Sequence, residues 1–198
     1  MAITFASVMI ISSGGSLSND GEPDAAEDAM GVVNGAVAIS GTALPTVPQA
    51  GADPALGRAF PSLQGTNLFN GSPLTIGADG RPKIVIFVAH WCPHCQAEVP
   101  VITQWMAEHG KPHDVDLYAV STAVAPERGN FPPASWLQRE KWPIPTMADT
   151  TDGNAFKAAG LTGFPSFVVL DAAGNVLSRP SGELSTRQFE LLLAQARS

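Results

Sequence analysis

A strand-to-helix corner that holds both cysteines of the chain constrains the fold most strongly. Residues 83–90 (KIVIFVAH) are apolar for most of their length, which predicts a buried strand. Residues 93–109 predict a helix that starts with Pro93, a residue suited to the first helical position. Cys92 lies between the two, and Cys95 follows three residues later. A strand that delivers a Cys-x-x-Cys motif to a helix N-terminus is typical of a dithiol redox site.

The position of Cys92 suits a nucleophilic thiol. A thiolate is the attacking species in disulfide exchange, and the unpaired N–H groups at a helix N-terminus favour a negative charge. Cys95 would lie on the adjoining helical turn, within reach of the Cys92 sulfur but more enclosed. We therefore predict Cys92 as the attacking thiol and Cys95 as the resolving one. His94 would tune the redox potential, because a cation stabilises the thiolate and so favours an oxidising disulfide.

Glu98 is a further candidate, three residues after Cys95 and on the neighbouring helical face. A partly buried carboxylate there could take the proton of Cys95 during exchange. A solvent-facing helix glutamate fits the spacing equally well, so both interpretations stay open.

Two other uses of the cysteine pair are less consistent with the pattern. A structural disulfide would close a loop of four residues, which restricts little chain entropy. A metal site could draw on His90, Cys92, His94 and Cys95. Four ligands within six consecutive residues at one corner cannot easily point at one ion, and no second Cys-x-x-Cys exists. We therefore predict no metal.

The charges of the chain are spread unevenly. No lysine or arginine precedes Arg58, whereas several acidic residues do, and these account for most of the formal net charge of −7. A basic nucleic-acid footprint is absent. Residues 14–55, rich in Gly, Ala, Pro and acids, predict a flexible linker, with a short strand near Val37 and Ile39.

Residues 1–13 form a short apolar leader. They lack the basic n-region of a signal peptide and the ~20 apolar residues of a membrane span. The leader is either the remnant of a longer signal or anchor, or the start of a soluble acidic segment. We favour the first and expect an extracytoplasmic protein, with or without a membrane anchor; a cytoplasmic location stays open.

Strand and helix patterns alternate over residues 56–198. Strands are predicted at 60–63, 74–76, 84–89, 115–121, 146–148, 166–170 and 176–178, and further helices at 134–141 and 154–159. The last helix starts with a capping box from Ser185 to Gln188 and buries Phe189, Leu192, Leu193 and Ala196. This order predicts an α/β domain: a mixed central β-sheet with helices on both faces, preceded by a disordered N-terminal segment.

From Leu56 to Leu193 the chain resembles the thioredoxin-like superfamily and, within it, the TlpA-type thiol–disulfide oxidoreductases of bacteria. The resemblance rests on Trp91-Cys92-Pro93-His94-Cys95, on Glu98-Val99-Pro100 and on Gly163-Phe164-Pro165-Ser166-Phe167. It implies a thioredoxin-like fold in which Pro165 is a cis proline beside the cysteines. Trp91, Phe164 and Pro165 would line the substrate groove, with the Phe164 backbone binding an incoming peptide. An ordinary trans proline is the alternative.

The resemblance also implies an exported reductase. We expect a monomer with no bound cofactor. Its partners would be protein thiols or disulfides and a membrane or soluble electron donor. Ile86 stands where thioredoxin has a buried aspartate, so Glu98 would handle protons alone. The Pro93-His94 dipeptide is that of DsbA, but residues 121–146 are too few for the helical domain of DsbA. A TlpA-type reductase is therefore expected; a DsbA-like oxidant and a metal-binding chaperone are the alternatives.

Overall fold

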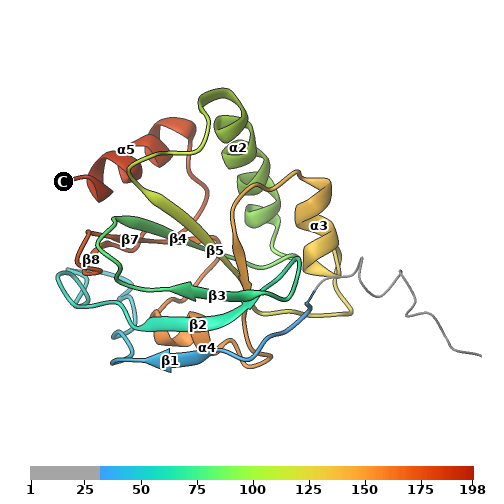
Figure 1. Ribbon diagram of the computed structural model, residues 1–198, viewed down its shortest axis with the longest axis horizontal. Coiled ribbons are helices and arrows are strands. Elements are labelled where there is room, and N and C mark those ends of the chain that lie inside the picture. The colour runs from blue at the N-terminus through green and yellow to red at the C-terminus, as the bar shows by residue number, and fades with distance from the viewer. Residues whose placement is uncertain (1–31) are drawn as a thin grey trace, which may run out of the picture.

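The structure is a computed structural model that describes residues 32–198, and it forms one mixed β-sheet covered by helices (Figure 1). Its strands are β1 (Ala38–Ser40), β2 (Ser62–Asn67), β3 (Pro73–Ile76), β4 (Lys83–Val88), β5 (Asp116–Ser121), β6 (Thr146–Ala148), β7 (Ser166–Leu170) and β8 (Val176–Ser178). Its helices are α2 (Pro93–His109), α3 (Pro133–Arg139), α4 (Asn154–Ala158) and α5 (Thr186–Ala196). The strand order is β1-β2-β6-β5-β4-β7-β8, and β3 also pairs with β2.

Strand β4 is central to the sheet. It pairs in parallel with β5 and antiparallel with β7, so that Ile86 lies opposite both Ala119 and Phe167. All six residues of β4 are buried, as the apolar run predicts. Ile84 belongs to the core on the α2 side of the sheet, and Val85 to the core on the other side.

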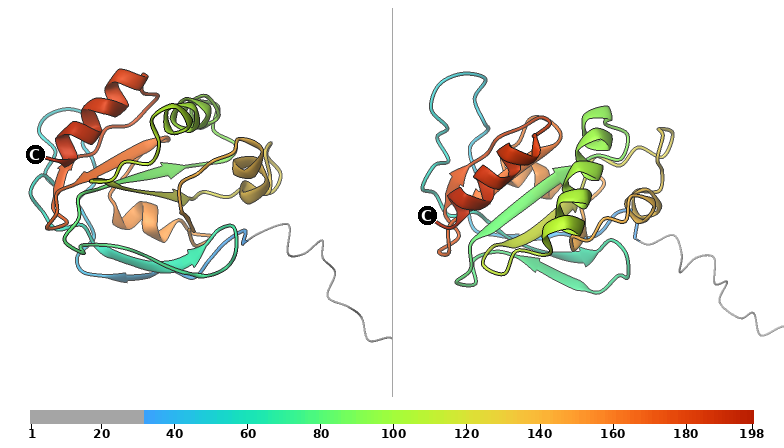
Figure 2. Two further views of the ribbon diagram at one scale, coloured as in Figure 1. Left: turned by 45° about the horizontal axis from the view of Figure 1, so that its top comes forward. Right: turned by 90° about the horizontal axis from the view of Figure 1, so that it is seen from above.

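The helices cover both faces of the sheet. Apolar residues of α2, α3 and α5 pack into one core cluster, and α2 and α5 lie side by side above the sheet (Figure 2). Ala155 of α4 belongs to the cluster on the opposite face. The predicted α/β architecture, a mixed sheet with helices on both faces, is therefore confirmed. Among residues 32–198, no helix combines the length and apolar character needed to cross a bilayer.

The predicted flexible linker is wrong for residues 32–55. Strand β1 pairs with β2, with Ile39 opposite Leu63, and Leu44 is buried with its N–H bonded to the Ala158 carbonyl at 2.8 Å. Asp53 forms an ion pair with the buried Arg179 of the loop after β8. These contacts join residues far apart in the sequence, so local composition does not predict them. The predicted leader 1–13 and residues 14–31 of the predicted linker lie outside the described residues.

Strand β2 starts later than the predicted strand 60–63. The Phe60 N–H donates to the Gly174 carbonyl at 2.9 Å, and Ala59 forms an isolated bridge with Asn175. The first predicted residue therefore bonds to the β7–β8 turn instead of entering the sheet beside β3. For the other predicted strands and helices, each predicted end lies within two residues of the observed end.

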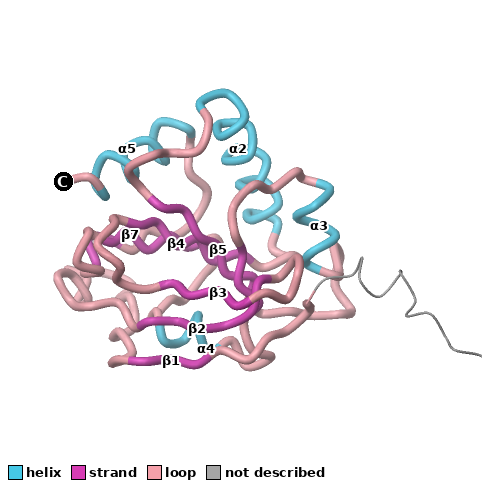
Figure 3. Tube along the Cα trace, viewed as in Figure 1, coloured by secondary structure: helices cyan, strands magenta, loops and turns pink. Residues whose placement is uncertain are grey.

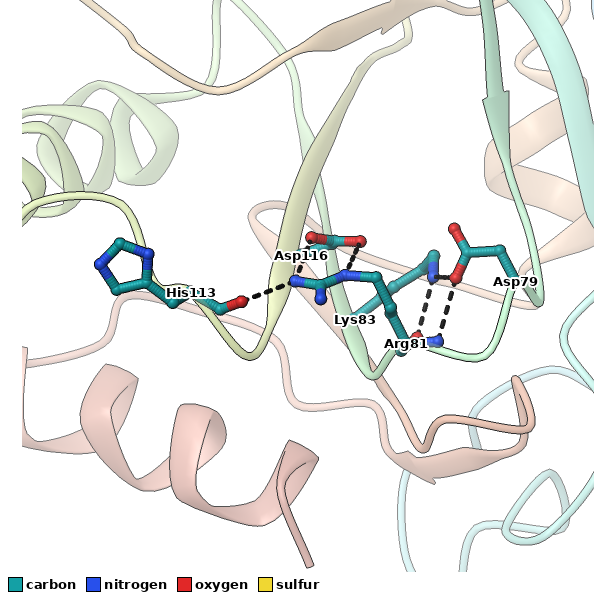
Figure 4. A network of polar contacts seen from close by, with 5 residues as sticks. All are labelled: Asp79, Arg81, Lys83, His113 and Asp116. Atoms are coloured by element: carbon teal, nitrogen blue, oxygen red, sulfur yellow. Dashed lines mark hydrogen bonds and ion pairs between the residues drawn. The ribbon is translucent and has the colours of Figure 1, made fainter.

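A polar network ties the loop before β4 to the start of β5 (Figure 4). The Arg81 guanidinium donates to both carboxylate oxygens of Asp116 at 3.0 Å and to the His113 carbonyl at 2.8 Å. The buried Lys83 ammonium bonds Asp79 and the Arg81 carbonyl, and its bond to Asp79 holds the pKa of that carboxyl below its usual value. The network lies at the N-terminal ends of β4 and β5, opposite the end that leads to Cys92.

Two loops, drawn in pink in Figure 3, lead from the sheet to the helices on the α2 side. Residues 122–132 join β5 to α3, and residues 179–185 join β8 to α5. Both loops supply groups to the candidate site.

Candidate active site

Cys92 is the N-cap residue of α2, immediately after the turn that follows β4. Its N–H donates to the Ala89 carbonyl at 3.0 Å, which closes the turn, and Pro93 takes the first helical position as predicted. The side chain is 6% exposed, and its Sγ lies 3.6 Å from the Phe164 carbonyl, to which the thiol donates. The predicted strand-to-helix corner is therefore confirmed.

Cys95 is fully buried on the first turn of α2. Its Sγ accepts the Ala89 N–H at 3.4 Å. Burial raises the pKa of the Cys95 thiol well above its usual range, and the nearby Cys92 and Glu98 add to this rise. Both cysteines are free thiols. The two sulfurs thus differ as the sequence suggests, with Cys95 the more enclosed.

Glu98 lies one turn beyond Cys95 and is only 1% exposed. Its Oε2 accepts the Leu184 N–H at 2.6 Å, whereas its buried Oε1 has no hydrogen-bond partner. Burial raises the pKa of Glu98 to about 7, against the opposing effect of the Leu184 N–H. Of the two interpretations of this residue, the buried carboxyl is correct, and such a group can bind or release a proton near neutral pH.

Two of the predicted groove residues, Trp91 and Phe164, lie next to Cys92. The Phe164–Pro165 peptide bond is cis, as the resemblance implies, and a second cis bond joins Phe131 to Pro132. The Trp91 ring meets the Phe164 ring edge-on with centroids 6.1 Å apart. The Trp91 indole N–H donates to the Ala123 carbonyl at 2.7 Å. Two partly exposed aromatic residues in contact with each other therefore lie next to Cys92.

His94 lies at the rim of this site. Its Nδ1 is 2.6 Å from Oε1 of Glu183, in the loop after β8, and the two side chains are 66% and 49% exposed. The imidazole therefore has a carboxylate partner that the sequence analysis missed. The two residues are 89 positions apart, and no local pattern marks the pair.

His90 forms hydrogen bonds to the backbone of the 122–132 loop, a role that the sequence analysis also missed. The buried imidazole bonds the Gly129 carbonyl through Nδ1 at 2.7 Å and accepts the Ala125 N–H at Nε2 at 3.1 Å. This pattern requires the proton on Nδ1, and burial lowers the pKa of His90, which favours the neutral ring. The only sequence feature that could have indicated a buried His90 is its position directly after the apolar run 84–89.

Arg128, in the same loop, lies over Trp91. Its guanidinium carbon is 4.1 Å from the centroid of the Trp91 ring, a cation–π contact. Together with the Ala123 carbonyl, it fixes the orientation of the indole beside Cys92. The basic residue was not identified from the sequence, because a loop of unknown course does not reveal which ring it will cover.

The potential metal ligands do not converge. Both ring nitrogens of His90 bond the backbone of the 122–132 loop, and His94 faces Glu183. Within residues 32–198, no group of three or more His, Cys, Asp and Glu side chains is arranged to hold a metal ion. The geometry gives no support to a metal-binding chaperone.

Comparison with known proteins agrees with this geometry. A model of the Redoxin family matches residues 55–192. A thiol:disulfide interchange protein DsbE homolog of Paracoccus denitrificans is 28% identical over 136 residues, which cover 68% of this chain and 70% of the relative.

Solved structures have the same fold. A thiol:disulfide interchange protein of the thioredoxin family from Chlorobium tepidum is 26% identical, with a TM-score of 0.55 over 75% of this chain and 100% of that one. StoA of Bacillus subtilis is 20% identical, with a TM-score of 0.56 over 71% of this chain and 99% of that one.

Proposed function

The chain belongs to the Redoxin family and is a thiol–disulfide oxidoreductase, and from this premise we propose that it reduces disulfides of exported proteins through Cys92 and Cys95. The observation that carries the proposal is the asymmetry of the two thiols. Cys92 lies at the N-terminus of α2, next to the partly exposed Trp91 and with its thiol on the Phe164 carbonyl, whereas Cys95 is fully buried.

In the proposed reaction, the Cys92 thiolate attacks one sulfur of a substrate disulfide and releases the other as a thiolate. A mixed disulfide then joins Cys92 to the substrate. The Cys95 thiolate attacks the Cys92 sulfur, which releases the reduced substrate and leaves a Cys92–Cys95 disulfide. A dithiol donor restores the pair by transferring two electrons and two protons.

Glu98 would take the proton of Cys95 in the second step. The Cys95 thiol holds its proton tightly because it is buried, so its attack requires a nearby base. Glu98 has a pKa of about 7 and an unpaired, buried Oε1. A carboxyl group of this pKa can accept a proton and then release it near neutral pH.

A peptide would bind next to the cis proline, along the backbone of Phe164. The Phe164 carbonyl already lies 3.6 Å from the Cys92 sulfur, so a strand bonded to this residue would pass directly over the thiol. Trp91 borders the same position and would contact apolar side chains that flank the substrate cysteine.

The direction of exchange is proposed to be reductive. Between β5 and β6 the chain forms only the seven-residue α3, without a helical domain like that of DsbA. The Pro93-His94 dipeptide is the one feature that favours the alternative, a DsbA-like oxidant. The equilibrium of the cysteine pair with glutathione separates the two. A potential near the −270 mV of thioredoxin supports a reductase, and one near the −120 mV of DsbA would establish an oxidant.

Catalysis is tested by the reduction of insulin disulfides with dithiothreitol as the electron source. The protein should accelerate the reduction, and Cys92→Ser should abolish the acceleration. A wild-type protein no faster than dithiothreitol alone would refute the proposed activity.

We also propose that the protein is a monomer outside the cytoplasm, supplied with electrons by a membrane or soluble donor. The location is supported by the resemblance to TlpA-type oxidoreductases, which are typically exported, and by the similarity to the DsbE homolog. Fusing alkaline phosphatase, which is active only after export, to the C-terminus of the full chain tests it. An inactive fusion would contradict export, and sedimentation of the purified protein would reveal a dimer.

A further inference from the structure

The exposed pair formed by His94 and Glu183 joins the cysteine motif to the 179–185 loop. Nδ1 of His94 and Oε1 of Glu183 are 2.6 Å apart, which is a short charge-assisted hydrogen bond when the imidazole is protonated. His94 is one of the two residues between the cysteines, so its charge lies near the reacting sulfurs in the chain.

The loop that carries Glu183 is held in place on both sides. The Gly182 N–H and the Ser181 hydroxyl both donate to the Pro165 carbonyl at 2.9 Å. On the other side, the Leu184 N–H donates to Oε2 of Glu98 at 2.6 Å. Ser185 then caps α5 with a complete capping box. These bonds fix the backbone of Glu183 opposite His94, so the contact is a consequence of the fold.

The charge of a histidine at this position has a known consequence for a dithiol. A cation beside the attacking sulfur stabilises the thiolate, and therefore the reduced form, which raises the reduction potential. A carboxylate that accepts the imidazole N–H compensates the positive charge. The dipeptide alone would thus predict a more oxidising protein than the pair does.

We propose that Glu183 is a positioning residue that pairs with His94 and keeps the Cys92–Cys95 couple more reducing than its Pro93-His94 dipeptide would make it. The inference rests on the proposed function, because it concerns the poise of the same dithiol. It explains how a DsbA-type dipeptide can serve a reductase. The negative charge of Glu183 also contributes to the raised pKa of Glu98, so it disfavours negative charge on a second group of the site.

The test is the redox equilibrium of the full chain with glutathione. The Cys92–Cys95 disulfide takes two electrons and two protons from two glutathione thiols, giving the dithiol and one glutathione disulfide. We would compare wild type with Glu183→Gln at about pH 6. Glutamine keeps the size of the side chain and removes its charge. The equilibrium constant should shift toward the dithiol by about threefold, which is about 14 mV for a two-electron couple.

Two comparisons separate the pair from a general charge effect. The shift caused by Glu183→Gln should be smaller when His94→Ala is also present, because the mechanism acts through the imidazole. Glu108→Gln is the matched control: it removes the same charge from the far end of α2, about 20 Å along the helix axis, and should leave the constant unchanged.

An unchanged constant in Glu183→Gln, or an equal shift with and without His94, would overturn the inference while leaving the proposed function standing. A wild-type protein that does not exchange with glutathione at all would refute both.

Discussion

Replacing Glu98 with glutamine should remove a pH-dependent loss of stability that this carboxyl imposes on the fold. Glu98 is buried, one of its oxygens has no partner, and its pKa is raised to about 7. In the unfolded chain, a glutamate ionises near its ordinary pKa of 4.5. Between these values the unfolded state releases a proton that the folded state keeps, so stability falls as pH rises through this window.

The size of the effect follows from the rise in pKa. A rise from 4.5 to about 7 corresponds to about 3 kcal/mol, as an order of magnitude. This contribution to stability is fully present below about pH 4 and is lost once the pH exceeds the folded-state pKa of about 7. A domain of this size has about 5–15 kcal/mol in total, so the effect is readily measured.

Urea unfolding of the reduced protein at several pH values between 4 and 8 provides the assay. The difference in free energy of unfolding between wild type and Glu98→Gln should change by about 3 kcal/mol across the range, in favour of the variant at high pH. Burying the new amide changes the stability of the variant by the same amount at every pH, so it does not affect how the difference varies with pH. Glu108→Gln, an exposed change on the same helix, should show no such trend. Parallel pH profiles for wild type and Glu98→Gln would refute a buried carboxyl of raised pKa.

Three further substitutions test contacts that hold other segments of the fold in place. Arg179→Met should lower the free energy of unfolding by about 3 kcal/mol, because Asp53 loses its buried partner; urea unfolding within ~1 kcal/mol of wild type would contradict this. His90→Ala should speed hydrogen exchange at the Ala125 amide, which loses its acceptor; unchanged protection would show that the loop is held by other contacts. Ser185→Ala should cost about 1 kcal/mol through loss of the α5 cap, and an unchanged Tm would speak against it.

The sequence predicts those parts of the fold that depend on local pattern. The buried run of β4 and the helix signals around Pro93 and Ser185 each belong to a continuous stretch of chain. The cysteine corner is predicted for the same reason. The cis Pro165 was expected only through a resemblance, since no local rule places it beside Cys92.

Other parts depend on contacts between distant residues and were not predictable in this way. The segment over residues 32–55 has the composition of a linker, yet it is held by pairs such as Asp53 with Arg179. The partners Glu183 for His94 and the 122–132 loop for His90 likewise come from elsewhere in the chain. Residue type suggested that these histidines matter, but only the fold shows what each one bonds.

The order of attack by the two thiols is tested most directly with a matched pair of variants, Cys95→Ser and Cys92→Ser, each reduced and then mixed with a disulfide substrate such as insulin. Intact-protein mass spectrometry would record the mixed disulfide. We expect Cys95→Ser to capture the substrate through Cys92 and Cys92→Ser to capture none, because the remaining Cys95 is fully enclosed with a raised pKa. Equal capture by the two variants, or capture by Cys92→Ser alone, would contradict the account.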